Sequence, residues 1–77
     1  MLFRSISELT SDADGIISFI RGRDELLDEI ATLNIKVGNS LKYSFNENRI
    51  GNYYLVSIEG RELNIPVEMA NNIFIRI

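Results

Sequence analysis

Four stretches of this 77-residue chain alternate apolar and polar side chains, and this period of two constrains the fold more than any other feature of the sequence. Such alternation is typical of half-buried β-strands, whose successive side chains point to opposite faces of a sheet. The stretches span residues 41–45, 53–58, 61–65 and 73–77. The alternation predicts these core residues: Leu41, Tyr43, Phe45, Tyr54, Val56, Ile58, Leu63, Ile65, Ile73, Ile75 and Ile77.

Residues 15–20 are dense in Ile and Phe, and we expect a further strand there because the run is too short for a confident helix. Residues 24–34 follow the period of a helix instead, with one apolar stripe formed by Leu26, Leu27, Ile30 and Leu33. We expect this helix to stop at Asn34, since asparagine readily adopts the left-handed backbone that follows a helix. Ile35 would then contact Ile30, as in a Schellman ending.

Several short signals complete the order of elements. Ser5 and Glu8 have the spacing of a capping box, which predicts one helical turn. Residues 46–52 form a polar hairpin loop, Gly38 and Gly60 lie at turns, and Glu59-Gly60 suits a primed hairpin turn. Pro66 ends a strand because it cannot donate to a ladder, and residues 67–70 are expected to form one helical turn.

The expected order is therefore strand, helix, three-stranded meander, helical turn and strand. Short strands in so small a chain expose fewer edges when they curl into a barrel. We predict a mainly β, small α+β domain that spans residues 1–77: a five-stranded SH3-like barrel with one helix between the first strand and the meander.

Composition excludes several functions. The chain has no Cys and no His, so it lacks a Ser-His or Cys-His nucleophile, a disulfide and the commonest transition-metal ligands. Its net charge of −3 argues against binding to nucleic acid, which needs a basic face. No apolar stretch is long enough to insert into a membrane or to act as a signal peptide. We expect a cytoplasmic, non-enzymatic binding or regulatory module without a cofactor.

The ordered set of elements and residues resembles the FeoA family of ferrous iron transport accessory proteins, over nearly the whole chain. The resemblance is strongest over residues 25–38, where the family has a leucine-rich helix that runs into Leu-Gly-Ile-x-Pro-Gly. Asn34 stands for the usual glycine and Val37 for the usual proline. Residues 56–65 and 68–75 are similar to the family's strand, turn and strand and to its ending.

This resemblance implies an SH3-like barrel without enzymatic activity. It also implies a role with the permease FeoB, whose cytoplasmic GTPase domain is the usual proposed partner. Related SH3-like barrels end some metal-dependent repressors, and this chain lacks the winged-helix DNA-binding domain that those carry.

Two surfaces are candidates for partner binding. The first is the acidic helix, where Asp24 with Asp28 and Glu25 with Glu29 form like-charge pairs at i,i+4. A basic partner surface would relieve this repulsion, although a solvated helix face explains the pattern as well. Beside it, Leu27, Ile30 and Ala31 form a possible docking groove with the meander, again unless these residues simply pack in the core.

The second candidate surface is apolar. Ile50 is expected at the tip of a loop and Phe74 on the face opposite Ile73 and Ile75, so Ile50 and Phe74 are hard to bury in the same core. Either the Leu2-Phe3 arm covers Phe74, or Phe74 anchors a docking patch. For this fold, the most natural mode of binding is the addition of a partner peptide to an open strand edge. Weak self-association of the protein is a further hypothesis.

A metal site is the alternative hypothesis. The carboxylates of Glu8, Asp12 and Asp14, with Met69 as a further ligand, are the candidate donors for a divalent ion that would alter the association state. Asp12-Ala13-Asp14-Gly15 begins like a calcium loop, but no glutamate follows at the required spacing. Carboxylates alone bind borderline metals poorly against water.

Overall fold

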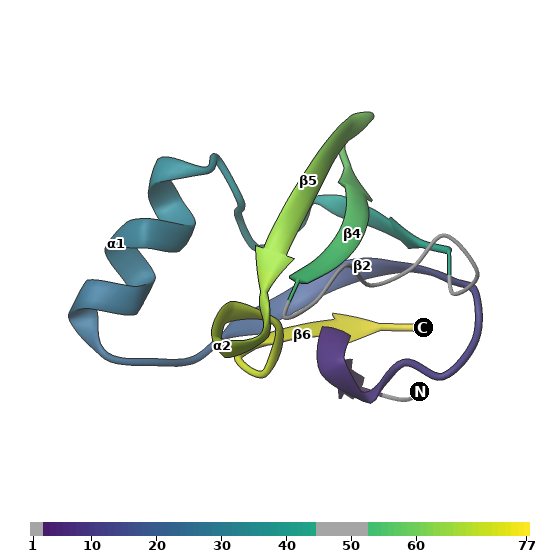
Figure 1. Ribbon diagram of the computed structural model, residues 1–77, viewed down its shortest axis with the longest axis horizontal. Helices are drawn as coiled ribbons and strands as arrows, with labels where there is room; N and C mark the ends of the chain where they lie inside the picture. Colours follow the sequence, from purple (N-terminus) through teal and green to yellow (C-terminus); the bar gives the residue numbers. More distant parts are fainter. Residues whose placement is uncertain (1–2, 45–52) are drawn as a thin grey trace.

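The computed structural model describes residues 3–44 and 53–77 (Figure 1). Its elements in chain order are β1 (Phe3–Ser5), the 3₁₀ turn η1 (Ile6–Glu8), β2 (Ala13–Ile20), α1 (Asp24–Thr32), β3 (Ser40–Tyr43), β4 (Tyr53–Ile58), β5 (Arg61–Pro66), α2 (Val67–Ala70) and β6 (Ile73–Arg76). The predicted order of strand, helix, meander, helical turn and strand is confirmed, and β1 is added before it. The predicted loop at 46–52, together with Ile50 and Phe45, lies outside the described residues.

The described strands form one antiparallel sheet in the order β1-β6-β2-β3-β4-β5. The predicted number of five strands is wrong, because β1 pairs with the opposite end of the chain, with Phe3 opposite Arg76 and Ser5 opposite Phe74. Three residues are too few to show a period in the sequence. Closure into a barrel is not confirmed, since within residues 3–44 and 53–77 the pairing has two ends, at β1 and β5.

The core consists of the inward side chains of the sheet together with residues from η1, α1 and α2. Its buried members are Ile6, Leu9, Ile17, Ile30, Ile35, Leu41, Tyr43, Tyr54, Val56, Ile58, Ile65, Met69, Ala70, Ile73 and Ile75. Leu63 is half-buried and packs against this cluster. Ile77, which the alternation assigned to the core, is 52% exposed because β6 ends one residue before it.

The capping box predicted at Ser5 and Glu8 is present. The Ser5 N–H donates to Glu8 Oε1 at 2.8 Å, and the Ser5 hydroxyl donates to the same oxygen at 3.0 Å. These bonds hold η1 as a single turn and direct Ile6 into the core, where it is fully buried.

Helix α1 ends in the predicted Schellman geometry. Asn34 has a φ of 59°, its N–H donates to the Ala31 carbonyl at 2.9 Å, and the Ile35 N–H donates to the Ile30 carbonyl at 3.4 Å. The helix lies to one side of the sheet (Figure 1). Ile30 of the helix and Ile35 just after it are buried in the core and attach the helix to the sheet. The Arg61 side chain donates to the carbonyls of Leu33 and Asn34 at 3.3 and 3.2 Å.

The turn between β4 and β5 is also as predicted. Glu59 and Gly60 both have positive φ, 51° and 81°, which is the signature of a type I′ hairpin turn. The Glu59 carboxylate accepts a hydrogen bond from the Ser40 N–H at 2.7 Å, so the turn is tied to the start of β3. Gly38, at φ 99°, begins the connection into β3.

Candidate interaction surfaces

Three phenylalanines from adjacent strands meet on the outer side of the sheet. Phe19 of β2 and Phe74 of β6 are opposite each other in the register, and their rings stack with centroids 4.5 Å apart and planes at 10°. The Phe3 ring of β1 lies 6.0 Å from that of Phe19. Phe3 is 49% exposed and Phe19 39% exposed, while Phe74 is half-buried between its neighbours.

Two arginines border these rings. The Arg21 guanidinium lies over the Phe74 ring, 4.5 Å from its centroid, which is a cation–π contact. Arg76 of β6 is opposite Phe3 on one neighbouring strand and Ile16 on the other, so the three side chains share the outer face. The guanidinium of Arg76 has no hydrogen-bond or ion-pair partner within the described part of the chain. We call Phe3, Phe19, Phe74, Arg21 and Arg76 the phenylalanine face.

A β-bulge explains why Phe19 belongs to this face. Ile17 is fully buried, and strict alternation would send Phe19 to the same side. The pairing of β2 with β6 shifts register between Ile17 and Phe19, which turns Phe19 outward. Sequence reasoning found Phe74 and the Phe3 arm but missed Phe19, because neither the bulge nor this long-range pairing leaves a local signal. Of the arm that was expected to cover Phe74, Phe3 contacts the ring of Phe19, and Leu2 lies outside the described residues.

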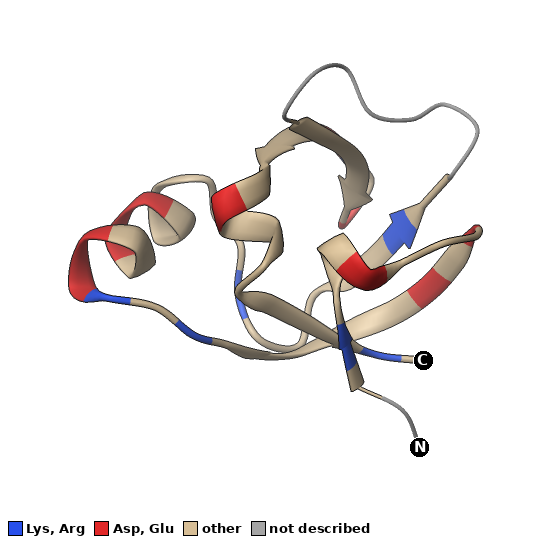
Figure 2. Cartoon of the chain, turned by 60° about the horizontal axis from the view of Figure 1, so that its bottom comes forward, with Lys and Arg blue, Asp and Glu red and all other residues tan. Residues whose placement is uncertain are grey.

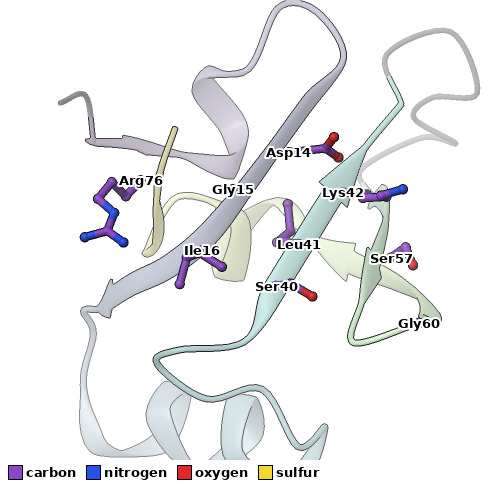
Figure 3. Close-up of a pocket in the computed structure, with 9 residues that line it drawn as sticks. All are labelled: Asp14, Gly15, Ile16, Ser40, Leu41, Lys42, Ser57, Gly60 and Arg76. Carbon is purple, nitrogen blue, oxygen red and sulfur yellow. The ribbon is translucent and has the colours of Figure 1, made fainter.

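A hollow of about 570 Å³ adjoins the phenylalanine face (Figure 3). Its lining combines apolar atoms of Ile16 and Leu41, the hydroxyls of Ser40 and Ser57, and the charged side chains of Asp14, Lys42 and Arg76. Gly15 lies in its floor, where a Cβ would come within 2.7 Å of the Arg76 carbonyl oxygen. A glycine is therefore required for the close approach of β2 and β6 beneath the hollow.

The acidic helix is the second surface. Asp24, Glu25, Asp28 and Glu29 are all exposed, and Figure 2 shows their positions on one end of the molecule, away from the Lys and Arg positions of β1 and β6. Ala31 is exposed and Leu27 half-buried, so both are accessible to a partner. Ile30 is not: it is 1% exposed and belongs to the core, which corrects its assignment as a docking residue.

The described residues do not bring the candidate metal ligands together. Glu8, Asp12 and Asp14 border one depression, but among the residues described no group of three His, Cys, Asp or Glu side chains is placed to hold a metal ion. Glu8 Oε1 already accepts two hydrogen bonds from Ser5, and these, the backbone bond foremost, lower the pKa of Glu8 below its ordinary value of 4.5. Met69 is buried in the core. The hypothesis of a shared site formed by these ligands is therefore not supported by the described geometry.

In the described part of the chain, no helix is long and apolar enough to cross a membrane. No family model matches the sequence, and no curated protein matches it either. Solved structures do share the fold, and several of them are metal-dependent regulators. A manganese-dependent transcriptional repressor superimposes with a TM-score of 0.82 at 15% identity, and IdeR of T. acidophilum with 0.80 at 23%. These superpositions cover 95% and 100% of this chain but only 40% and 35% of the regulators, so this chain spans well under half of their length.

One solved structure matches this chain over nearly the full length of both chains: that of an iron uptake regulatory protein, FeoA. Its crystal structure superimposes with a TM-score of 0.79 at 16% identity and covers 99% of this chain and 97% of that one. The resemblance inferred from the sequence is thus confirmed for the fold, which is mainly β and SH3-like. At such identities a superposition establishes the fold and not the activity.

Proposed function

We propose that this protein is a cytoplasmic, non-enzymatic accessory protein of ferrous iron uptake that binds the GTPase domain of an FeoB-type permease. The observation that carries the proposal is the superposition on FeoA over nearly the full length of both chains. The superpositions on the regulators, by contrast, leave most of each regulator unmatched.

The side chains support a binding role over a chemical one. The sequence has neither His nor Cys, so the usual nucleophiles and proton shuttles are missing. The two accessible surfaces, the acidic helix and the phenylalanine face, are of the kinds that partners contact. Aromatic residues and arginine are enriched in the cores of protein interfaces.

Calorimetric titration of the purified protein into the isolated GTPase domain tests this function. We expect saturable binding, with a dissociation constant on the order of 10⁻⁶ to 10⁻⁵ M, in at least one of the nucleotide-free, GDP-bound and GTP-analogue-bound states. The GTPase domain of an unrelated P-loop protein is the control and should bind no more than background. Absence of binding in all three states would contradict the proposal.

A second candidate function, a metal-responsive module, has the likeness to metal-dependent regulators in its favour. The positions of the carboxylates argue against this function, because no three of them among the described residues lie close enough together to hold a metal ion. Equilibrium dialysis with iron, manganese and zinc separates the two functions. If every one of these metal ions binds with a dissociation constant above about 10⁻³ M, metal binding is too weak to be physiological and the second function is ruled out.

A further inference from the structure

We propose that the phenylalanine face binds an acidic segment of a partner protein that carries an aromatic or leucine side chain among its carboxylates. The inference deepens the proposed function, on which it rests for the identity of the partner, by naming the surface and the chemistry that it recognises. It is argued below from apolar exposure, from charge, and from the hollow beside the rings.

The apolar part of the face is too exposed to be explained by packing alone. Phe3 and Phe19 stay exposed although each contacts another ring, and Ile16 on the same face is also exposed. Isolated exposed apolar residues are ordinary, whereas a contiguous group on adjacent strands marks an interaction surface. Stacking already fixes the orientation of Phe19 and Phe74, so a partner would lose little additional conformational freedom on binding them.

The two charged side chains of the face are both arginines, although the protein as a whole is acidic and Glu8 lies near enough to Arg21 for the two charges to attract. Arg21 is held over Phe74, and its backbone N–H donates to the Asn72 carbonyl at 2.8 Å, so the guanidinium is positioned before a partner arrives. Arg76 has five N–H donors and no partner for its side chain in the described part of the chain. Guanidinium groups bind carboxylates in a bidentate geometry. Four carboxylates lie instead on α1, which Figure 2 shows apart from β6.

The hollow gives the partner's apolar side chain a place to bind. Arg76 and Ile16 border both the hollow and the rings, so one segment could place a carboxylate on Arg76 and an aromatic or leucine side chain beside Ile16 (Figure 3). Asp14 lies on the far side of the hollow, directly opposite Lys42 in the strand register. Lys42 thus offsets the negative charge of Asp14 there.

The same features argue against a phosphate polymer or an anionic membrane as the ligand. Both need a broad basic surface, and this face has two arginines on a protein of net charge −3. Asp14 would also repel a phosphate placed in the hollow. A short segment with few carboxylates fits the two guanidinium groups better.

Titration of the isotope-labelled protein with a blocked synthetic peptide tests the inference by NMR. The probe alternates glutamate with phenylalanine and leucine, and its matched analogue has glutamine in place of each glutamate. We expect the acidic probe to shift the amide signals of β1, β2 and β6, and to bind about tenfold more tightly than the glutamine analogue. Added salt should weaken the acidic probe selectively.

Paired variants locate the binding. Arg76→Glu and Phe19→Ser should each weaken the acidic probe about tenfold, whereas Lys36→Glu and Val37→Ser, which change an exposed cation and an exposed apolar residue outside the face, should not. Dispersed amide spectra confirm that each variant folds. If Phe19→Ser fails to fold, Phe19→Leu replaces it, because it removes the ring stacking and retains apolar volume.

Three results would overturn the inference: no binding of the acidic probe, equal binding of its glutamine analogue, or equal loss of binding in Lys36→Glu. Tighter binding of oligothymidine or of phosphatidylserine vesicles to the same strands would overturn it as well, by assigning the face to a different macromolecule. The titration contains no GTPase domain, so the inference and the proposed function can fail separately.

Discussion

At the scale of single residues, the bonds from Ser5 to Glu8 make part of the stability dependent on pH. The Ser5 N–H and hydroxyl stabilise the ionised carboxylate, so the pKa of Glu8 in the folded protein lies below 4.5, the value it approaches when unfolded. Because the pKa of Glu8 is lower in the folded protein than in the unfolded chain, the ionised carboxylate contributes fully to the free energy of unfolding at pH values above the unfolded pKa. This contribution is lost as the pH falls through the folded pKa.

The variant Glu8→Gln should therefore be less stable than the wild type at pH 7, and the difference should narrow at pH 3. Urea unfolding at the two pH values measures this difference. The control Glu62→Gln removes one exposed negative charge without touching η1. A difference for Glu8→Gln that is the same at both pH values would show that the ionised carboxylate does not carry the effect.

Two neighbours on the apolar stripe of α1 distinguish core from surface. Ile30 is buried at the centre of the packing, whereas Leu27 is half-buried and is not among the side chains packed against the core. Ile30→Ala should lower the free energy of unfolding by about 2–5 kcal/mol, and Leu27→Ala by about 1 kcal/mol or less. Equal losses in the two variants, measured by denaturant unfolding, would contradict this division.

At the scale of elements, local patterns were sufficient for most of the fold. The period of two placed β4 and β5, and the left-handed preference of Asn34 placed the end of α1, because such signals depend only on neighbouring residues. The strand β1 and the bulge in β2 escaped prediction for the opposite reason. Both are defined by pairing with β6, about 70 residues away for β1, and sequence periodicity does not report such contacts.

The residues of the candidate surfaces also fall into two groups, those found from local sequence features and those defined by long-range strand pairing. Phe74 and the acidic positions of α1 could be found from the sequence, because an apolar residue opposite a core face and a run of carboxylates are local features. Phe19, Arg21 and Arg76 could not, since their role depends on which strands lie side by side. Ile30 was misassigned because a helical stripe alone does not reveal which of its members is innermost.

Arg61 of β5 makes a long-range contact with the C-terminal end of α1, where it donates to the carbonyls of Leu33, the C-cap, and of Asn34, the next residue. A cation that donates to these carbonyls both satisfies unpaired acceptors and complements the helix dipole. Arg61→Ala should therefore speed the exchange of α1 amide hydrogens about fivefold to tenfold, while the amides of β3 and β4 change less.

Hydrogen exchange followed by NMR measures this effect amide by amide. Arg61→Lys is the informative control: it keeps the positive charge but lacks the planar fork that reaches both carbonyls, so it should restore only part of the protection. Equal acceleration across the whole sheet would show that Arg61 stabilises the molecule globally and not α1.

At the scale of the whole molecule, the acidic helix and the phenylalanine face lie on different elements. The carboxylates of α1 occupy one end (Figure 2), and the phenylalanine face lies on β1, β6 and β2, with Arg21 in the connection between β2 and α1. A 77-residue protein thus has two chemically different surfaces, one on a helix and one on the sheet.

The most direct test of a docking role is an NMR titration of the isotope-labelled protein with the unlabelled GTPase domain of an FeoB-type permease, in each nucleotide state. We expect the amide signals of β1, β2 and β6 to shift or broaden in at least one state, and this response to be lost in Phe19→Ser but retained in Val37→Ser. A spectrum that stays unchanged at excess GTPase domain in every nucleotide state would contradict a role in binding that domain.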